Sequence, residues 1–261
     1  LNRQHVYKRL VLLGGAASGK TTALRFLALR AAERALGSDS EPVPILGYLV
    51  DLSKALQKAG TSIKTIETFV RSFSYGEYLL KCLESRSAML LLDGLDESGQ
   101  VKSTIETQLK DMMLKDEYKG NTIVVSSRPS GFPFADFRDF AVFAQAVPLS
   151  ASAQHAYARS ILSPKDYHSF QHSVLARPSM GQLAQTPLLF QLLVMLFSSS
   201  TSSSTQWVPM NRFQLLETAT AQMARNAGLS QVEDNEVLDI CQMLAHDAHV
   251  RRTKDFDGDD A

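Results

Sequence analysis

The eight residues from Gly14 to Thr21 have the types and spacing needed to hold phosphate groups. They read Gly-Gly-Ala-Ala-Ser-Gly-Lys-Thr and fit the pattern G-x-x-x-x-G-K-[ST]. Small residues let a backbone wrap closely around an anion, so that several N–H groups converge on its oxygen atoms. The sequence therefore predicts a loop that binds the phosphates of a nucleoside triphosphate.

Two side chains at the end of this loop have more specific expected roles. Lys20 can reach the β- and γ-phosphates with its ammonium group, and Thr21 can place its hydroxyl on Mg²⁺. A helix predicted over residues 20–36 would direct its positive N-terminal end at the same phosphates. The residues that we expect to contact the nucleotide here are Gly14, Gly15, Ala16, Ala17, Ser18, Gly19, Lys20, Thr21 and Thr22.

An acidic stretch follows the apolar run of residues 88–92. It reads Asp93-Gly-Leu-Asp96-Glu97, and an aspartate that ends a buried strand lies at the sheet edge where the phosphate loop also lies. We expect Asp93 to hold Mg²⁺ through water. Asp96 or Glu97 could orient or deprotonate the attacking water, and the alternative for one of them is to cap the next helix. The sequence does not decide which acid has which role.

An arginine follows another apolar run, residues 122–125, which continues as Ser126-Ser127-Arg128-Pro129. At the carboxyl end of a strand in the same sheet, Arg128 can contact the γ-phosphate and distinguish triphosphate from diphosphate. The alternative is an arginine in a surface loop, and its position along the chain leaves both interpretations open.

The elements that must position these residues are visible as apolar runs separated by helical patterns. Five short runs are almost continuously apolar, as in strands buried on both faces of a parallel sheet: 10–13, 45–50, 88–92, 122–125 and 141–146. Helical periodicity over residues 20–36 and 101–114 lies between them. This alternation predicts an α/β fold, a five-stranded, mainly parallel sheet flanked by helices.

Beyond residue 147 the strand pattern stops and helical patterns continue. We expect helices over residues 150–162, 167–175, 181–197, 211–226 and 232–250, with the first capped by Ser150 or Ser152. The serine-rich segment 198–205 has low complexity and is expected to be a loop. The second half of the chain is therefore predicted to be all-α.

Composition excludes several classes of protein. The 27 basic and 27 acidic residues balance, which argues against a nucleic-acid-binding surface. The longest apolar run, residues 187–197, is shorter than the roughly 20 residues that cross a bilayer. Two cysteines, Cys82 and Cys241, are too few for a disulfide framework, and with no secretory signal they indicate a reducing, cytoplasmic location.

The three motifs together resemble those of the NACHT family, a branch of the STAND signalling ATPases that includes the NOD-like receptors. The Asp-Gly-Leu-Asp-Glu stretch at 93–97 is the most specific element. Ser127-Arg128-Pro129 resembles the family's sensor arginine, with Ser126 where threonine is more usual. The stretch Leu-Ala-Gln-Thr-Pro-Leu-Leu beginning at residue 183 resembles the helical-domain signature whose proline, here Pro187, packs beside adenine. A plain proline at the start of a helix would look the same.

The resemblance implies a signalling switch that uses ATP or ADP with Mg²⁺. Diphosphate holds the family's closed monomer, triphosphate permits assembly into homo-oligomers, and hydrolysis is slow. The implied domains are a P-loop domain (1–148), a helical domain (149–200) and a segment leading towards a winged-helix-like domain (201–261). An N-terminal effector domain and a C-terminal sensor domain are expected in a longer protein.

The sequence lacks features that three other functions would require or favour. A housekeeping ATPase or small-molecule kinase would need an arginine-rich lid or, for an ABC-type ATPase, a Leu-Ser-Gly-Gly-Gln-like signature, and the sequence has neither. A GTPase would need the guanine-specific Asn-Lys-x-Asp stretch, which is absent. A scaffold without nucleotide chemistry would not be expected to fill every catalytic position. The sequence thus favours a weak ATPase that acts as a switch.

Overall fold

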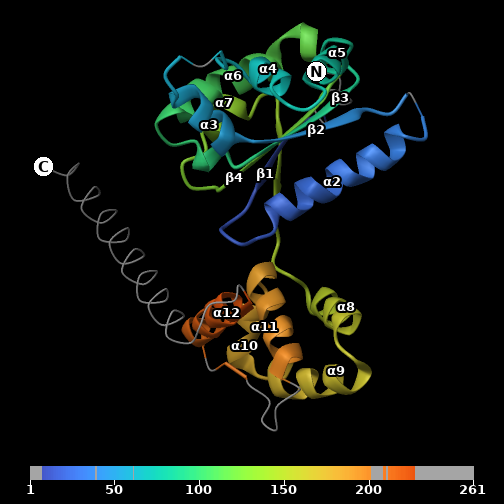
Figure 1. Cartoon of the computed structure of the whole chain (residues 1–261), viewed down its shortest axis with the longest axis vertical. Coiled ribbons are helices and arrows are strands. Elements are labelled where there is room, and N and C mark those ends of the chain that lie inside the picture. Colours follow the sequence, from blue (N-terminus) through green and yellow to red (C-terminus); the bar gives the residue numbers. More distant parts are fainter. Residues whose placement is uncertain (1–7, 39, 61, 201–207, 210, 227–261) are drawn as a thin grey trace, which may run out of the picture. The chain divides into compact units, whose positions relative to one another are not determined.

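The computed structural model describes residues 8–38, 40–60, 62–200, 208–209 and 211–226 (Figure 1). The chain divides into two compact units, Leu1–Pro148 and Leu149–Ala261, and each is described by itself. The predicted helix over 232–250 and residues 201–205 of the serine-rich segment lie outside the described residues.

The first unit is built on a five-stranded sheet with the order β2-β3-β4-β1-β5, in which every neighbouring pair is parallel. The strands are β1 (Arg9–Leu13), β2 (Val43–Tyr48), β3 (Ala88–Asp93), β4 (Thr122–Ser127) and β5 (Val142–Gln145). The predicted fold class is therefore confirmed. The strand predicted over 45–50 lies two residues too far along the chain, because Leu49 already begins a helix that directs Leu49 and Leu52 into the core.

Helices cover the two faces of this sheet unequally. Alternate residues of a strand point to opposite faces, so Val11 and Leu13 join the large core while Leu10 and Leu12 pack near Leu24 of α2. Figure 1 shows α2 on one side of the strands and α3, α4, α6 and α7 on the other. The helices are α2 (Lys20–Ala35), α3 (Leu49–Gln57), α4 (Ile66–Arg71), α5 (Gly76–Glu84), α6 (Lys102–Leu114) and α7 (Phe134–Phe137). The periodicity of the sequence predicts α2 and α6 but not the short helices between β2 and β3, which have too few turns to show it.

The amino-terminal ends of the strands are tied together by buried polar side chains. The Asn121 side chain accepts a hydrogen bond from the Ala88 N–H at 2.9 Å and donates one to the Leu83 carbonyl at 2.8 Å. The buried Arg9 guanidinium donates to the carbonyls of Tyr118 at 2.8 Å and Asn121 at 2.6 Å. These contacts fix β1, β3 and β4 at the edge opposite to their carboxyl ends.

We expect Asn121→Ala to destabilise the first unit by about 1–3 kcal/mol, because it leaves the buried Ala88 N–H without its partner and removes one hydrogen bond from the Leu83 carbonyl, which keeps the one from the Arg86 N–H. The measurement is urea-induced unfolding of the whole chain. Gln100→Ala, which removes an exposed amide, is the control and should leave the unfolding midpoint unchanged. Equal midpoints for the two variants would show that Asn121 does not hold these strands together.

The second unit consists of helices around a separate aromatic core. The elements are α8 (Ala151–Ile161), α9 (Pro164–Phe170), the π-helical turn η4 (Gln171–Leu175), α10 (Pro178–Ala184), α11 (Pro187–Ser200) and α12 (Arg212–Asn226). Phe170 lies at the centre, with its ring 5.1 Å from that of Phe197 and 6.1 Å from that of Phe190. The predicted N-cap is confirmed, since the Ser150 hydroxyl accepts a hydrogen bond from the Ala153 N–H.

Two predicted helices of this unit differ from the structure. The single helix predicted over 181–197 is wrong, because α10 ends at Ala184 and α11 begins at Pro187. Proline lacks an N–H donor and disfavours helical geometry in the residue before it, so the chain breaks there. The helix predicted over 167–175 begins earlier, at Pro164, where the Ser163 side chain caps it.

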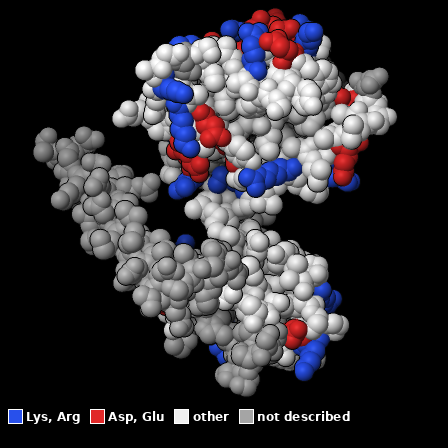
Figure 2. All heavy atoms as spheres, in the orientation of Figure 1, with Lys and Arg blue, Asp and Glu red and all other residues white. Residues whose placement is uncertain are grey.

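Charged side chains of both signs lie side by side on the face of the first unit drawn in Figure 2. No large area of one sign is visible on that face, in keeping with the equal numbers of basic and acidic residues. None of the helices in the described part of the chain has the length and apolarity that crossing a bilayer requires.

Candidate functional site

The glycine-rich loop connects β1 directly to α2, as the motif requires. The Gly14 N–H donates to the Ser127 carbonyl at 3.2 Å and so continues the pairing of β1 with β4 by one residue. Ala17 (φ 62°) and Gly19 (φ 88°) then adopt the left-handed conformation, which turns the backbone so that α2 begins at Lys20. Gly15 and Ala16, at the tip, are exposed.

The base of the loop is packed too closely for any side chain at Gly14. A Cβ atom there would lie 2.5 Å from the Ser18 hydroxyl oxygen and 2.9 Å from the Ala146 Cβ. The Ser18 hydroxyl is buried and has no hydrogen-bond partner in the described part of the protein. A phosphate oxygen would supply the missing acceptor, so a tight loop with an unused donor fits a phosphate group.

Lys20 folds back over the loop rather than extending into solvent. Its ammonium group donates to the carbonyls of Gly14 at 2.8 Å and Gly15 at 3.0 Å. An ammonium group has three N–H donors, so one remains after these two bonds. The positive charge is therefore held beside the backbone that the motif predicts to surround the phosphates.

Thr21 and Asp93 are in direct contact. The Thr21 hydroxyl donates to Asp93 Oδ2 at 2.6 Å, while the Ser126 hydroxyl donates to Asp93 Oδ1. Asp93 is 8% exposed, and the Gly94 N–H donates to the Ser126 hydroxyl oxygen at 2.9 Å. Because Thr21 directs its proton at Asp93, its oxygen lone pairs remain available to a cation, and Asp93 can bind the same cation through water.

The strand order explains why these residues meet. β4 lies between β1 and β3, so the ends of β1 and β3 are two strand spacings apart, about 10 Å. The first turn of α2 crosses this gap, since α2 packs near the buried Leu91 of β3. The two motifs predicted for one sheet edge are thus brought together at the start of α2.

Ser126 precedes the arginine motif in the sequence, but the sequence predicts no role for its side chain in the site. Leu92 of β3 pairs with Val125 of β4, so Asp93 and Ser126 are the next residues along neighbouring strands. In the sequence, Ser126 is visible only as a hydroxyl residue directly after an apolar run. Its contact with Asp93 can be predicted only when β3 and β4 are known to be neighbours.

Asp96 and Arg128 form an ion pair at the same sheet edge. The Arg128 N–H donates to Asp96 Oδ1 at 2.9 Å, and the Arg128 Nε lies 2.9 Å from Asp96 Oδ2. Asp96 and Glu97 belong to the single 3₁₀ turn η1 (Leu95–Glu97), and Glu97 is exposed. The prediction that one of these acids caps the next helix is wrong, because no side chain caps α6.

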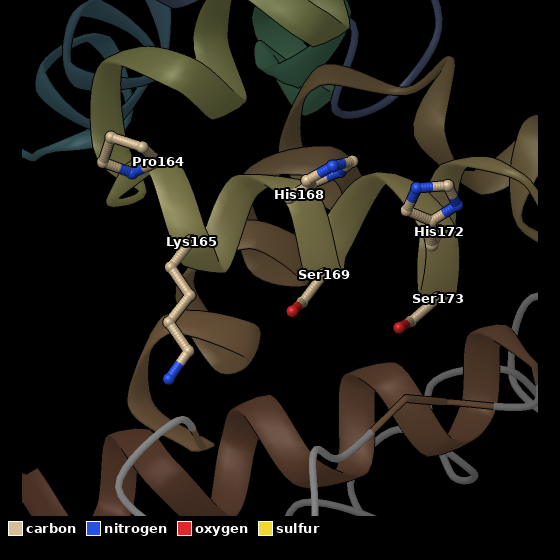
Figure 3. A pocket seen from close by; sticks show the side chains of 6 residues that line it. All are labelled: Pro164, Lys165, His168, Ser169, His172 and Ser173. Carbon is tan, nitrogen blue, oxygen red and sulfur yellow. The ribbon is translucent and has the colours of Figure 1, made fainter.

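The second unit, taken by itself, has two features of interest. Pro187 is the first residue of α11, a position at which proline is common in helices. Its contact with adenine stays a prediction. A hollow of about 460 Å³ on α9 and η4 is lined by His168 and His172, whose ring centroids are 5.0 Å apart, with Lys165 and Ser169 nearby (Figure 3). No group of three or more potential metal-binding His, Cys, Asp or Glu side chains is found among the residues that the structure describes.

No protein-family model matches the chain, and no curated protein matches it. Among solved structures, C. elegans PCH-2 is 14% identical with a TM-score of 0.49, covering 85% of this chain and 63% of its own. A STAND protein with a tetratricopeptide repeat sensor from Pyrococcus horikoshii is 15% identical with a TM-score of 0.40, covering 85% of this chain and 32% of its own.

The chain spans less than two thirds of the length of either structure. Similarity at these identities and TM-scores carries no information about activity. The parallel sheet, the loop that leads from β1 into α2 and the carboxylate at the end of β3 together identify the fold. The first unit has the α/β fold of P-loop NTPases.

Proposed function

We propose that this protein binds ATP and ADP with Mg²⁺ and acts as a NACHT-type signalling switch. The observation that carries the proposal is the 2.6 Å hydrogen bond between Thr21 and Asp93, beside the glycine-rich loop. It joins the phosphate-binding motif to the acidic strand end within one group of residues. The nature of the switch rests on the Asp-Gly-Leu-Asp-Glu stretch and on Arg128.

The loop residues would bind the phosphates. The backbone N–H groups from Gly15 to Lys20 and the unpartnered Ser18 hydroxyl supply donors, and the Lys20 ammonium supplies charge. Mg²⁺, when bound, offsets the negative charge of the β- and γ-phosphates. Thr21 would coordinate it with its hydroxyl oxygen and Asp93 through water, since both Asp93 oxygens already accept hydrogen bonds.

Slow hydrolysis is the expected consequence of how the acids are held. Glu97 is exposed, and no hydrogen bond or ion pair of its side chain is found in the described part of the chain. A general base that is not held by neighbouring groups is poorly preorganised. Glu97 can therefore deprotonate water when a nucleotide is bound, but at a low rate.

The proposed cycle follows the family pattern. Diphosphate would hold a monomer, and triphosphate would allow copies of the protein to assemble in the cytoplasm. Pro187 would pack beside the adenine, and effector and sensor domains would lie in further parts of a longer protein. The alternative is a P-loop ATPase or kinase with a housekeeping catalytic role.

Assembly is the property that separates these two functions. We expect the chain to be monomeric with ADP and to form larger species with a non-hydrolysable ATP analogue, both with Mg²⁺. The measurement is size-exclusion chromatography with light scattering, together with steady-state phosphate release. An unchanged mass together with turnover of many molecules per second would contradict the switch and favour the housekeeping enzyme.

A further inference from the structure

Asp96 uses both of its carboxylate oxygens to hold one residue. Oδ1 accepts the backbone N–H of Arg128 and Oδ2 accepts its Nε, each at 2.9 Å. The Asp96 side chain is 13% exposed and the Arg128 side chain 42% exposed, so the ion pair is partly shielded from water. A carboxylate that holds both the backbone and the side chain of an arginine fixes the direction of that side chain.

The terminal nitrogens of Arg128 remain available. A guanidinium group has five N–H donors, and Nε carries one of them, which Asp96 accepts. No other hydrogen bond or ion pair of the Arg128 side chain is found within the described ranges. The four donors on Nη1 and Nη2 have the planar geometry that recognises phosphate oxygens.

Arg128 also follows directly on residues that contact both motifs. The Ser127 carbonyl accepts the Gly14 N–H, and the Ser126 hydroxyl donates to Asp93. The guanidinium group is thus anchored at the same sheet edge as the phosphate loop and the expected Mg²⁺ ligands.

We propose that Asp96 is a positioning residue, which holds Arg128 by Nε so that its terminal nitrogens contact the γ-phosphate of a bound triphosphate. Asp96 is less suited than Glu97 to act on the attacking water, because both of its oxygens bind Arg128 and its side chain is only 13% exposed, whereas Glu97 is exposed. This leaves Glu97 as the acid that faces water. The inference rests on the proposed nucleotide binding, and it assigns different roles to two acids that are adjacent in the sequence.

The test is the affinity of Asp96→Asn for ADP and for a non-hydrolysable ATP analogue, measured with Mg²⁺. Asparagine keeps an oxygen for the Arg128 N–H but loses the charge that holds Nε. We expect the affinity for the ATP analogue to fall about tenfold, while the affinity for ADP stays within about twofold of the wild type. Arg128→Lys keeps the charge without Nε, and it should show the same selective loss.

Two controls make the outcome decisive. Asp139→Asn removes an exposed carboxylate from the same unit and should leave both affinities unchanged. Glu97→Gln should slow phosphate release while retaining the affinity for the ATP analogue. The inference is overturned if Asp96→Asn keeps its affinity for the ATP analogue, or if it loses both nucleotides equally. If the wild type binds neither nucleotide, the proposed function itself fails.

Discussion

Lys20→Ala is expected to weaken the binding of both ADP and ATP by about 100-fold, or about 3 kcal/mol. The Lys20 ammonium lies over the loop, within hydrogen-bond distance of the carbonyls of Gly14 and Gly15. In the proposed complex it is the charged donor nearest to the β-phosphate, which both nucleotides have. Removing it should therefore affect both ligands, unlike a change at Arg128.

The measurement is titration of the chain with fluorescent ADP and ATP analogues in the presence of Mg²⁺. Lys81→Ala removes an exposed lysine of the same unit and should bind as the wild type does. Thermal unfolding without nucleotide should be nearly the same for the two variants, because Lys20 bonds only to carbonyls of the half-exposed loop. If Lys20→Ala binds nucleotide as well as Lys81→Ala, the loop is not a phosphate site.

Asp93→Asn is expected to remove most of the effect of Mg²⁺ on triphosphate binding and to lower hydrolysis by about 100-fold. Asparagine has nearly the same shape, so the buried position remains filled. It loses the negative charge, however, and can accept a hydrogen bond from only one of the two hydroxyls, those of Thr21 and Ser126. The Thr21 lone pairs would then no longer be directed reliably at a cation.

This prediction is checked by comparing the affinity for the ATP analogue in Mg²⁺ and in EDTA. The wild type should bind more tightly with Mg²⁺, whereas the two affinities of Asp93→Asn should be nearly equal. Asp139→Asn provides the matched control, with a magnesium effect like that of the wild type. A full magnesium effect in Asp93→Asn would place the cation elsewhere in the protein.

The three acids of one short stretch have three different surroundings. Asp93 is buried between two hydroxyls, Asp96 holds an arginine, and Glu97 is exposed. The left-handed turn at Gly94 (φ 82°) separates the first acid from the other two. Their different partners suit them to bind a cation, position a charged side chain and react with water, respectively.

Much of the fold was predictable because its signals are local. The loop between β1 and α2 depends on small residues next to one another, and the helix that follows has its own periodicity. Almost continuous apolar runs indicated a parallel sheet, which the structure confirms. The break before Pro187 was missed, because the apolar periodicity continues across it while the backbone cannot.

By itself, the sequence determined the glycine-rich loop before α2, the fold class and the acidic strand end, since each depends on residues close together in the chain. Only the tertiary structure decided that β4 lies between β1 and β3, and with it the contact of Ser126 with Asp93. The pairing of Asp96 with Arg128 has the same origin, because these residues are 32 positions apart. Contacts of this kind depend on which strands are neighbours, and the packing of the whole unit determines that order.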